Sequence, residues 1–359
     1  MTDCIVVGGG LIGMLTARYL QEAGARVHIL EQGNLGQEST WAGGGILSPL
    51  YPWRYPEPVN RLAFYSQSRY EALCQDLLSE TGLDPEWTRS GLLMLAPEDE
   101  CEGLQWAQGT PAAMERIDSV GIHKVEPALA RIPELALWMP EVAQVRNPRL
   151  VKALRRSLEL RGITLSEQVQ VTEVLTSEGS VTGVNTDQGI YQADHVLVAG
   201  GAWSARLVSL MGGEPLPVEP VRGQMILFRA RPGLLKRIIL DQGRYLIPRR
   251  DGHIVVGSTM EYVGFDKCTT ESAREELVSE ALSLVPGLAE ADIERHWAGL
   301  RPGSPQGIPF IGPHPEIGGL FVNTGHFRNG VVMGLASAEL SASQIMGAKP
   351  VLDDEPYRF

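Results

Sequence analysis

The stretch Cys4-Ile5-Val6-Val7-Gly8-Gly9-Gly10-Leu11-Ile12-Gly13 decides the fold, because it joins a short apolar run to a glycine turn of the form G-x-G-x-x-G. Apolar residues then recur near helical spacing until Gly24, which predicts a helix that ends there. Residues 27–30 read as a second strand, and Glu31 follows directly. Strand, turn, helix, strand and acid in this order predict a unit that binds a dinucleotide.

Each glycine of this turn has its own expected role. Gly8 makes the tight turn, Gly10 lets the backbone approach a pyrophosphate, and Gly13 lets helix and strand pack closely. Glu31 stands where an acid takes both hydroxyls of an adenosine ribose, which disfavours the 2′-phosphate of NADP. A glycine string alone is a weak signal, but here the flanking elements are all in register with it.

Composition narrows the class of protein. The chain has 359 residues, which is long enough for two domains, and its 43% apolar and 21% charged residues are typical of a soluble globular protein. A net charge of −12 disfavours nucleic acid and anionic membranes as partners. No apolar run reaches the ~18 residues of a membrane-spanning helix. The N-terminus lacks the positive region of a signal peptide.

The four cysteines lie far apart and form no C-x-x-C pair. Neither a metal site nor a disulfide framework is therefore indicated, and we expect a cytoplasmic protein.

A second glycine-rich segment, residues 32–50, follows the acid. It contains Ser39-Thr40-Trp41-Ala42-Gly43-Gly44-Gly45-Ile46-Leu47, and successive glycines beside hydroxyls suit a loop that lies flat against a ligand. A flexible linker is the alternative interpretation. The apolar side chains of Trp41, Ile46 and Leu47 disfavour it.

The middle of the chain alternates between helical and strand patterns. An amphipathic helix is predicted over 60–80 and a strand over 91–95. Asn147-Pro148 predicts the start of another helix, with Asn147 as its cap. Alternating segments at 168–174, 180–186 and 190–192 then predict a small antiparallel meander.

A buried strand over 194–199 leads into a second glycine turn, which would return the chain to the same cofactor. From residue 217 the pattern becomes β-rich. Asp251-Gly252 predicts a two-residue hairpin turn that places Tyr245 and Met260 near the ends of adjacent strands. A helix is expected over 271–285.

The C-terminal part repeats the strand–turn–helix order. A strand at 320–322 precedes Thr324-Gly325-His326-Phe327-Arg328-Asn329-Gly330 and a helix of small residues over 331–345. Free N–H groups at such a helix start bind anions. We therefore expect a second backbone anion site here.

Taken together, GGGLIG with Glu31, STWAGGGIL, DHVLVAGGAWS, WAGLRPG and TGHFRNG resemble the FAD-dependent amine oxidases of the D-amino-acid oxidase and sarcosine oxidase superfamily. Within it the resemblance is greatest to the glycine oxidases associated with bacterial thiamine biosynthesis. It implies an α/β fold with a Rossmann-like FAD-binding domain in discontinuous segments, 1–84, 146–216 and 296–359. An α+β substrate domain with a mainly antiparallel sheet would comprise 85–145 and 217–295.

The resemblance also implies where FAD is bound. Ser39 and Thr40 would lie beside the phosphates and Gly44 to Ile46 along the isoalloxazine ring, while Val171 would bond the adenine through its backbone. In chain order the implied contacts are Gly8, Gly10, Leu11, Ile12, Gly13, Glu31, Gln32, Ser39, Thr40, Gly44, Gly45, Ile46, Val171, His326, Phe327, Arg328, Asn329, Gly330, Val331 and Val332. Ile46 stands where the glycine oxidase pattern has methionine, which bears on the size of the pocket.

Substrate contacts follow from the same resemblance. Arg301 matches the carboxylate-binding arginine, Arg328 a second active-site arginine, Tyr245 the substrate tyrosine and Met260 a pocket-wall methionine. Each has a structural alternative. Arg301 could order a loop, Arg328 could pair with a carboxylate elsewhere, Tyr245 and Met260 could be core, and His326 could only shape its turn.

The implied activity is oxidation of glycine, sarcosine and small D-amino acids. A substrate with a neutral amine would give hydride to flavin N5 and leave as an imine, which water hydrolyses to an oxo acid and ammonia or an amine. Molecular oxygen would accept the electrons and yield hydrogen peroxide, with no metal required. We expect a homo-oligomer. A D-amino-acid dehydrogenase that reduces a quinone, and a non-catalytic flavin-binding module, are the alternatives.

Overall fold

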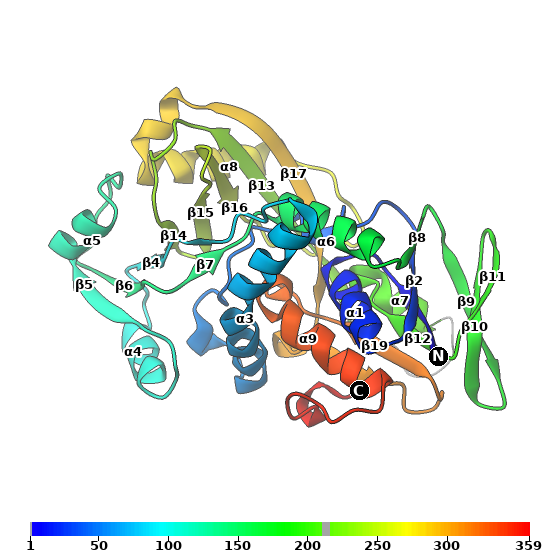
Figure 1. Cartoon of the computed structure of the whole chain (residues 1–359). Helices are drawn as coiled ribbons and strands as arrows, with labels where there is room; N and C mark the ends of the chain where they lie inside the picture. Colours follow the sequence, from blue (N-terminus) through cyan, green and yellow to red (C-terminus); the bar gives the residue numbers. More distant parts are fainter. Residues whose placement is uncertain (1, 210–215) are drawn as a thin grey trace.

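The computed structural model describes residues 2–209 and 216–359, arranged around two large sheets (Figure 1). Met1 and residues 210–215, which fall in the expected flavin-domain segments 1–84 and 146–216, lie outside the described residues.

The first sheet contains the predicted dinucleotide unit. Its strands come from distant parts of the chain, in the order β18 (Phe310–Pro313), β19 (Leu320–Thr324), β12 (His195–Val198), β1 (Asp3–Val7), β2 (Arg26–Glu31) and β8 (Thr164–Glu167). All pairs are parallel except β18 with β19. The carboxyl ends of the parallel strands therefore meet at one edge, where ligands bind in such folds.

Alternating side chains of β1 enter two different cores. Cys4 and Val6 face a helical layer, whereas Ile5 and Val7 face the opposite side. The helical layer consists of α1 (Leu11–Glu22), α3 (Glu57–Thr81), α6 (Asn147–Leu160) and α9 (Gly330–Ile345). Helix α9 packs against both α1 and α3 (Figure 1), which explains why its small side chains are apolar on most sides.

The opposite side of this sheet is covered by the predicted meander. It consists of β9 (Val171–Ser177), β10 (Ser180–Thr186) and β11 (Gly189–Gln192), in an antiparallel sheet that projects at one end of the molecule (Figure 1). The short helix α7 (Ser204–Ser209) lies on the same side. The prediction of the meander is confirmed.

The second sheet is mainly antiparallel, as expected. Its order is β17 (Asp292–Gly303), β13 (Glu219–Arg229), β16 (His253–Gly257), β15 (Arg244–Pro248), β14 (Ile238–Asp241), β4 (Leu92–Leu95), β6 (Leu135–Met139) and β5 (Glu115–Asp118). Only β14 with β4 is parallel among these pairs. One face packs on α8 (Glu271–Leu284), and the other presents Met225, Tyr245 and Ile247. The predicted fold class is confirmed.

The hairpin between β15 and β16 forms where Asp251-Gly252 predicted it, but its turn has three residues, 250–252. Arg249 N donates to the carbonyl oxygen of His253 at 2.7 Å, and Gly252 N donates to that of Arg249 at 3.1 Å. Gly252 has φ 93°, which a residue with a side chain adopts only with strain. The left-handed glycine takes up the extra residue as a bulge.

Strand β17 crosses the expected boundary between residues 295 and 296. It pairs with β13 along its whole length, from Asp292 with Arg229 to Gly303 with Glu219. Arg301 is therefore carried by the second sheet. We propose that the last flavin-domain segment begins after Gly303.

Short elements complete the described chain: α2 (Ser39–Ala42), β3 (Thr88–Arg89), α4 (Glu100–Gln108), α5 (Ser119–Val125) and β7 (Ala143–Gln144), with short 3-10 turns such as Gly201–Trp203 and Pro286–Glu290. Across residues 2–209 and 216–359, no helix combines the length and the apolar character needed to cross a bilayer.

Candidate active site

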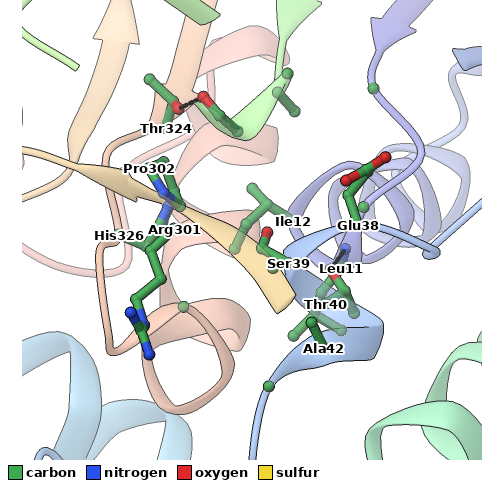
Figure 2. Close-up of a pocket in the computed structure, with 18 of the residues that line it drawn as sticks. Leu11, Ile12, Glu38, Ser39, Thr40, Ala42, Arg301, Pro302, Thr324 and His326 are labelled. Atoms are coloured by element: carbon green, nitrogen blue, oxygen red, sulfur yellow. Dashed lines mark hydrogen bonds between the residues drawn. The ribbon is translucent and has the colours of Figure 1, made fainter. Parts of the chain in front are cut away.

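A cavity of about 370 Å³ lies between the strand ends of the first sheet and the face of the second that carries Met225 and Tyr245. Figure 2 shows Arg301 and His326 on one side and Leu11, Thr40 and Glu38 on the other. The predicted residues that line it are Gly8, Gly10, Leu11, Ile12, Glu31, Gln32, Ser39, Thr40, Gly44, Gly45, Ile46, Val171, Tyr245, Arg301, His326, Phe327, Arg328, Gly330 and Val331. Gly13, Met260, Asn329 and Val332 do not line it.

The three motif glycines differ in what surrounds them. Gly8 has φ 115°, and a Cβ there would lie 2.4 Å from the carbonyl oxygen of Ala199. A Cβ on Gly13 would lie 2.0 Å from the carbonyl oxygen of Gly8, so this glycine serves the packing of α1 on β1. At Gly10 the nearest atom would be Thr40 Oγ1 at 3.5 Å. Gly10 therefore leaves its backbone open to a ligand in the cavity.

Helix α1 begins at the cavity with a positive end that no acidic side chain compensates in the first turn. Gly10 at its N-cap has no side chain to bond the free N–H groups. Thr40 Oγ1, from α2, accepts from Leu11 N at 2.9 Å instead (Figure 2). The Thr40 hydroxyl proton remains available to a phosphate oxygen, as a site beside the phosphates requires.

Glu31 ends β2 with its carboxylate held by backbone groups. Its two oxygens accept from Gly9 N at 2.7 Å and from Gly33 N at 2.8 Å. Burial raises the pKa of Glu31, and these two hydrogen bonds oppose that shift. A carboxylate has about four acceptor positions, so two remain for ribose hydroxyls.

The end of the cavity next to Glu31, where adenosine is expected, is lined by residues of β9 and α7. Val171 lies there as expected, beside Val169 and Thr172. Arg206 of α7 also lines this end with an exposed side chain. No sequence motif marks Arg206, because the short helix that carries it follows a turn without periodic apolar residues.

A buried arginine, Arg249, contacts the loop from Gly43 to Ile46. No sequence motif indicates this role. Arg249 Nη2 donates to the carbonyl oxygen of Gly44 at 2.8 Å, and its Nη1 donates to Gln144 Oε1 at 2.6 Å and to Val145 O at 3.1 Å. Burial lowers the pKa of Arg249 to about 10. A Cβ on Gly45, which has φ 75°, would lie 2.1 Å from Val145 O.

Asn147 also supports this loop, and it does not cap α6 as predicted. Arg146 occupies the N-cap position, and Asn147 is the first helical residue. Its buried side chain donates from Nδ2 to the carbonyl oxygen of Thr40 at 2.6 Å. An asparagine before a proline is typical of a helix N-cap, but here the hydrogen bond to Thr40 determines the role of Asn147.

The C-terminal turn places His326 deep in the cavity wall. Its ring is 3% exposed, and its Nε2 has no hydrogen-bond partner among the described residues. Burial lowers the pKa of His326 to about 3, so the ring is neutral near pH 7. An unpaired buried polar atom is costly, which is consistent with a ligand that bonds it.

Helix α9 begins directly after this turn. Gly330 and Val331 line the cavity at its N-terminus, whereas Asn329 is its N-cap and Val332 packs in the core against α3. The first residues of α9 therefore lie where the second backbone anion site is expected, and Val332 serves the core.

Two arginines and a tyrosine gather at the end of the cavity remote from Glu31. Arg301 donates from Nη2 to Ser258 Oγ at 2.7 Å, and Arg328 donates to the carbonyl oxygen of Gly243 at 3.4 Å. Desolvation lowers the pKa of Arg301, the Tyr245 hydroxyl opposes this shift, and the charge of Arg328 adds to it.

The partners of both arginines in the described residues are carbonyl and hydroxyl oxygens, with no carboxylate among them. Two cations that face a cavity without a paired anion are suited to bind a ligand carboxylate.

Met260 is the one predicted substrate residue that the structure does not bring to the cavity. Strand β16 ends at Gly257, and Met260 lies in the following loop with 53% of its side chain exposed. Met225 lines the cavity instead, 3.8 Å from the Tyr245 hydroxyl through its Sδ atom. Met225 and Tyr245 both pair with Gly257, which has no side chain to separate them.

The residues present fit FAD. The cavity extends from Glu31 and Val171, suited to adenosine, past the open Gly10 backbone and the start of α1, suited to a pyrophosphate. It ends between the Gly44 loop, the unpaired His326 Nε2 and the start of α9, where a flat ring has polar partners at its edge.

Comparison with known proteins agrees with this geometry. The model of the FAD-dependent oxidoreductase family DAO matches residues 3–344. The chain is 49% identical to the glycine oxidase of Pseudomonas aeruginosa, over 98% of this chain and 97% of that protein.

The chain is also 32% identical to the bifunctional protein ThiO/ThiG of Trichormus variabilis, over 99% of this chain and 54% of that protein. The crystal structure of glycine oxidase from Geobacillus kaustophilus superposes with a TM-score of 0.93 at 28% identity, covering 100% of this chain and 98% of that one. The chain therefore belongs to the DAO family of FAD-dependent oxidoreductases, among the glycine oxidases, and its cofactor is FAD.

Proposed function

We propose that this flavoenzyme oxidises glycine, sarcosine and small D-amino acids to the oxo acid, ammonia or an amine, and hydrogen peroxide. The observation that carries the proposal is the pair Arg301 and Arg328, which face one end of the cavity beside Tyr245 without a carboxylate partner in the described chain. The resemblance of the chain to glycine oxidases supports the same substrate class.

In this proposal Arg301 binds the substrate carboxylate with charge-assisted hydrogen bonds, and the Tyr245 hydroxyl donates to the same group. Arg301 retains N–H groups for this contact, because a guanidinium has five donors. Fixing the carboxylate also fixes which hydrogen of the α-carbon faces the flavin.

The charges at this end of the cavity select the protonation state of the amine. The acids that line the cavity within the described residues are Glu31 and Glu38, and both lie at the nucleotide end. If the substrate amine were protonated, its positive charge would lie near two arginines, with no acidic side chain of the protein at this end to balance it. The site favours a neutral amine, whose lone pair assists loss of the α-hydrogen.

The walls near Tyr245 support a substrate side chain that is apolar or absent. Ile46, Leu50 and Met225 line the cavity near Tyr245, and all are apolar. When bound, FAD would supply the hydride acceptor and the means by which molecular oxygen receives the electrons. The start of α9, at Gly330 and Val331, favours negative charge in this part of the cavity.

The proposal is tested by mixing the purified protein with glycine, sarcosine, D-alanine and D-proline. We expect bleaching of the flavin absorbance without oxygen and release of peroxide with it. A yellow protein that shows neither response with any of these substrates contradicts the proposal. Bleaching without turnover in oxygen, relieved by a soluble quinone, would instead identify the dehydrogenase alternative.

Replacement of Arg301 distinguishes an enzyme from a flavin-binding module. Arg301→Leu is expected to retain FAD and to raise the KM for glycine by about two orders of magnitude, the effect of losing charge-assisted hydrogen bonds. The matched control is Arg229→Leu, whose exposed side chain pairs with Glu294 at the far end of the second sheet. In a non-catalytic module, Arg301→Leu and Arg229→Leu would have equally small effects on the flavin response to glycine.

We further propose a role in thiamine biosynthesis, which the similarity to the ThiO/ThiG relative supports. A strain that lacks this gene should then need added thiamine or its precursors for normal growth. A cytoplasmic homo-oligomer remains our prediction.

A further inference from the structure

The guanidinium of Arg301 rests on a strand residue that has no side chain. In the pairing of β17 with β13, Arg301 lies opposite Val221, and Gly299 lies opposite Gly223. A Cβ built on Gly223 would lie 2.1 Å from Arg301 Nη2 and 2.4 Å from both Cζ and Nη1. Any side chain at position 223 would therefore occupy the space of the guanidinium.

The backbone does not require glycine at this position. Gly223 is not among the glycines with positive φ, so its conformation is open to other residues. Glycine in the interior of a strand weakens the strand relative to alanine and often marks a close approach of another group. The close approach here is that of the Arg301 head group.

The other side of the guanidinium is held by the segment that follows β16. Arg301 Nη2 donates to Ser258 Oγ at 2.7 Å, and Nη1 donates to the carbonyl oxygen of Thr259 at 3.2 Å. These contacts fix the plane of the group on Gly223 and leave its other N–H groups for a ligand.

Buried polar contacts anchor this segment in turn. Gln224 N donates to Thr259 Oγ1 at 2.8 Å, and Arg244 Nη1 donates to the carbonyl oxygen of Ser258 at 2.6 Å. Arg222, which is 5% exposed, pairs with Glu261 at 2.5 Å. Ser258 is thereby held at a fixed place relative to β13, the strand that carries Gly223.

We propose that Gly223 and Ser258 are positioning residues for the carboxylate-binding arginine: Gly223 provides the space and Ser258 the hydrogen bond that hold the Arg301 guanidinium in register with a substrate carboxylate. This inference rests on the proposed function, in which Arg301 binds that carboxylate. Both residues act through Arg301 and need not touch the substrate.

Gly223→Ala tests the space. The atoms that a methyl group would meet belong to the end of a flexible side chain, so the variant is expected to fold and to retain FAD while Arg301 moves aside. Acetate, a carboxylate without an amine, is titrated against the flavin absorbance of the holoenzyme. We expect its Kd and the KM for glycine to rise about tenfold or more, which corresponds to about 1.4 kcal/mol, with a smaller change in kcat.

Ser258→Ala and Ser258→Thr test the hydrogen bond. The alanine variant should weaken acetate binding several-fold, and the threonine variant, which keeps the hydroxyl, should restore most of the affinity. The control is Gly287→Ala, where a Cβ would meet Leu234 Cδ1 at 2.8 Å, a milder crowding of a flexible side chain without contact to Arg301. It should leave acetate binding unchanged.

A Gly223→Ala holoenzyme with wild-type affinity for acetate overturns the proposal. If the Gly223→Ala variant loses FAD, the Ser258→Ala variant decides instead. An affinity for acetate equal to that of the wild type would then overturn the proposal. Failure of the proposed function is distinguishable, because a wild-type protein that binds acetate but does not oxidise glycine contradicts the activity and not the positioning of Arg301.

Discussion

The imidazole of His326 is buried without charge, and this makes the stability of the protein sensitive to acid. Burial lowers its pKa to about 3, against about 6.5 in an unfolded chain. Between these values the unfolded state binds more protons, so stability falls as the pH falls from about 6.5 towards 3, by at most about 1.4 kcal/mol per pH unit. Above about pH 6.5 the group contributes no pH dependence.

We therefore expect His326→Asn to lose less thermal stability than the wild type between about pH 7.5 and about pH 5. The measurement is the midpoint of thermal unfolding of each protein at both values. His123→Asn, on an exposed position of α5, serves as the control and should keep the wild-type acid dependence. If His326→Asn shows the same acid dependence as the wild type, burial of the neutral ring is not its cause.

Single residues were predictable where the chain contacts a ligand through a contiguous motif. Gly8, Gly10 and Gly13 have the surroundings that their spacing implied, because one turn determines all of them. Met225 was not predictable, because it reaches Tyr245 only through the register of three strands across Gly257. The place of Met260 after a strand predicts a residue of the pocket wall, but the loop that carries Met260 faces outward.

The loop from Gly43 to Ile46 depends on elements that follow it by a hundred residues or more. Arg249, at the end of β15, bonds Gly44 O, Gln144 and Val145 O, and so holds the loop on its side away from the cavity. A lysine cannot replace a planar group that makes three such bonds. Arg249→Lys should weaken FAD binding about tenfold and lower stability by about 1–3 kcal/mol, the cost of leaving buried acceptors unpaired.

The affinity is measured by titrating FAD into the apoprotein and following flavin fluorescence. Arg250→Lys is the control, because Arg250 is the next residue but its exposed side chain bonds Asp84 and Thr88 at the surface. Equal FAD affinity of the two variants would show that the loop holds its shape without Arg249.

Elements themselves were mostly predictable, because periodicity acts over a few residues. The first strand–helix–strand unit, the meander and the helices near 60–80, 147 and 271–285 formed as predicted. The continuous strand β17 was not predicted, since Arg301-Pro302-Gly303 reads as a loop. Proline is tolerated there because β17 is at the edge of its sheet, where one side of the strand needs no hydrogen bonds.

At the scale of the whole molecule, the cavity is lined by both sheets and by four separate parts of the chain, residues 7–50, 169–207, 223–258 and 299–331. A ligand that fills it stabilises the folded state by RT ln(1 + [L]/Kd), about 2.7 kcal/mol at a hundredfold excess over Kd. FAD should therefore raise the midpoint of thermal unfolding of the apoprotein with increasing concentration. FMN, which lacks the adenosine half, leaves Glu31 and Val171 without a partner and should raise it less at the same concentration.

The comparison isolates the end of the cavity at Glu31 and Val171, because the ring and one phosphate are common to both cofactors. Glu31→Ala should reduce the advantage of FAD over FMN, since its ribose contact is lost for FAD alone, while the effect of FMN stays the same. Gly9 and Gly33 would lose an acceptor in this variant, so both unfolding midpoints are compared with that of the same apoprotein. Equal stabilisation by FAD and FMN in the wild type would show that the adenosine end of the cavity contributes no binding energy.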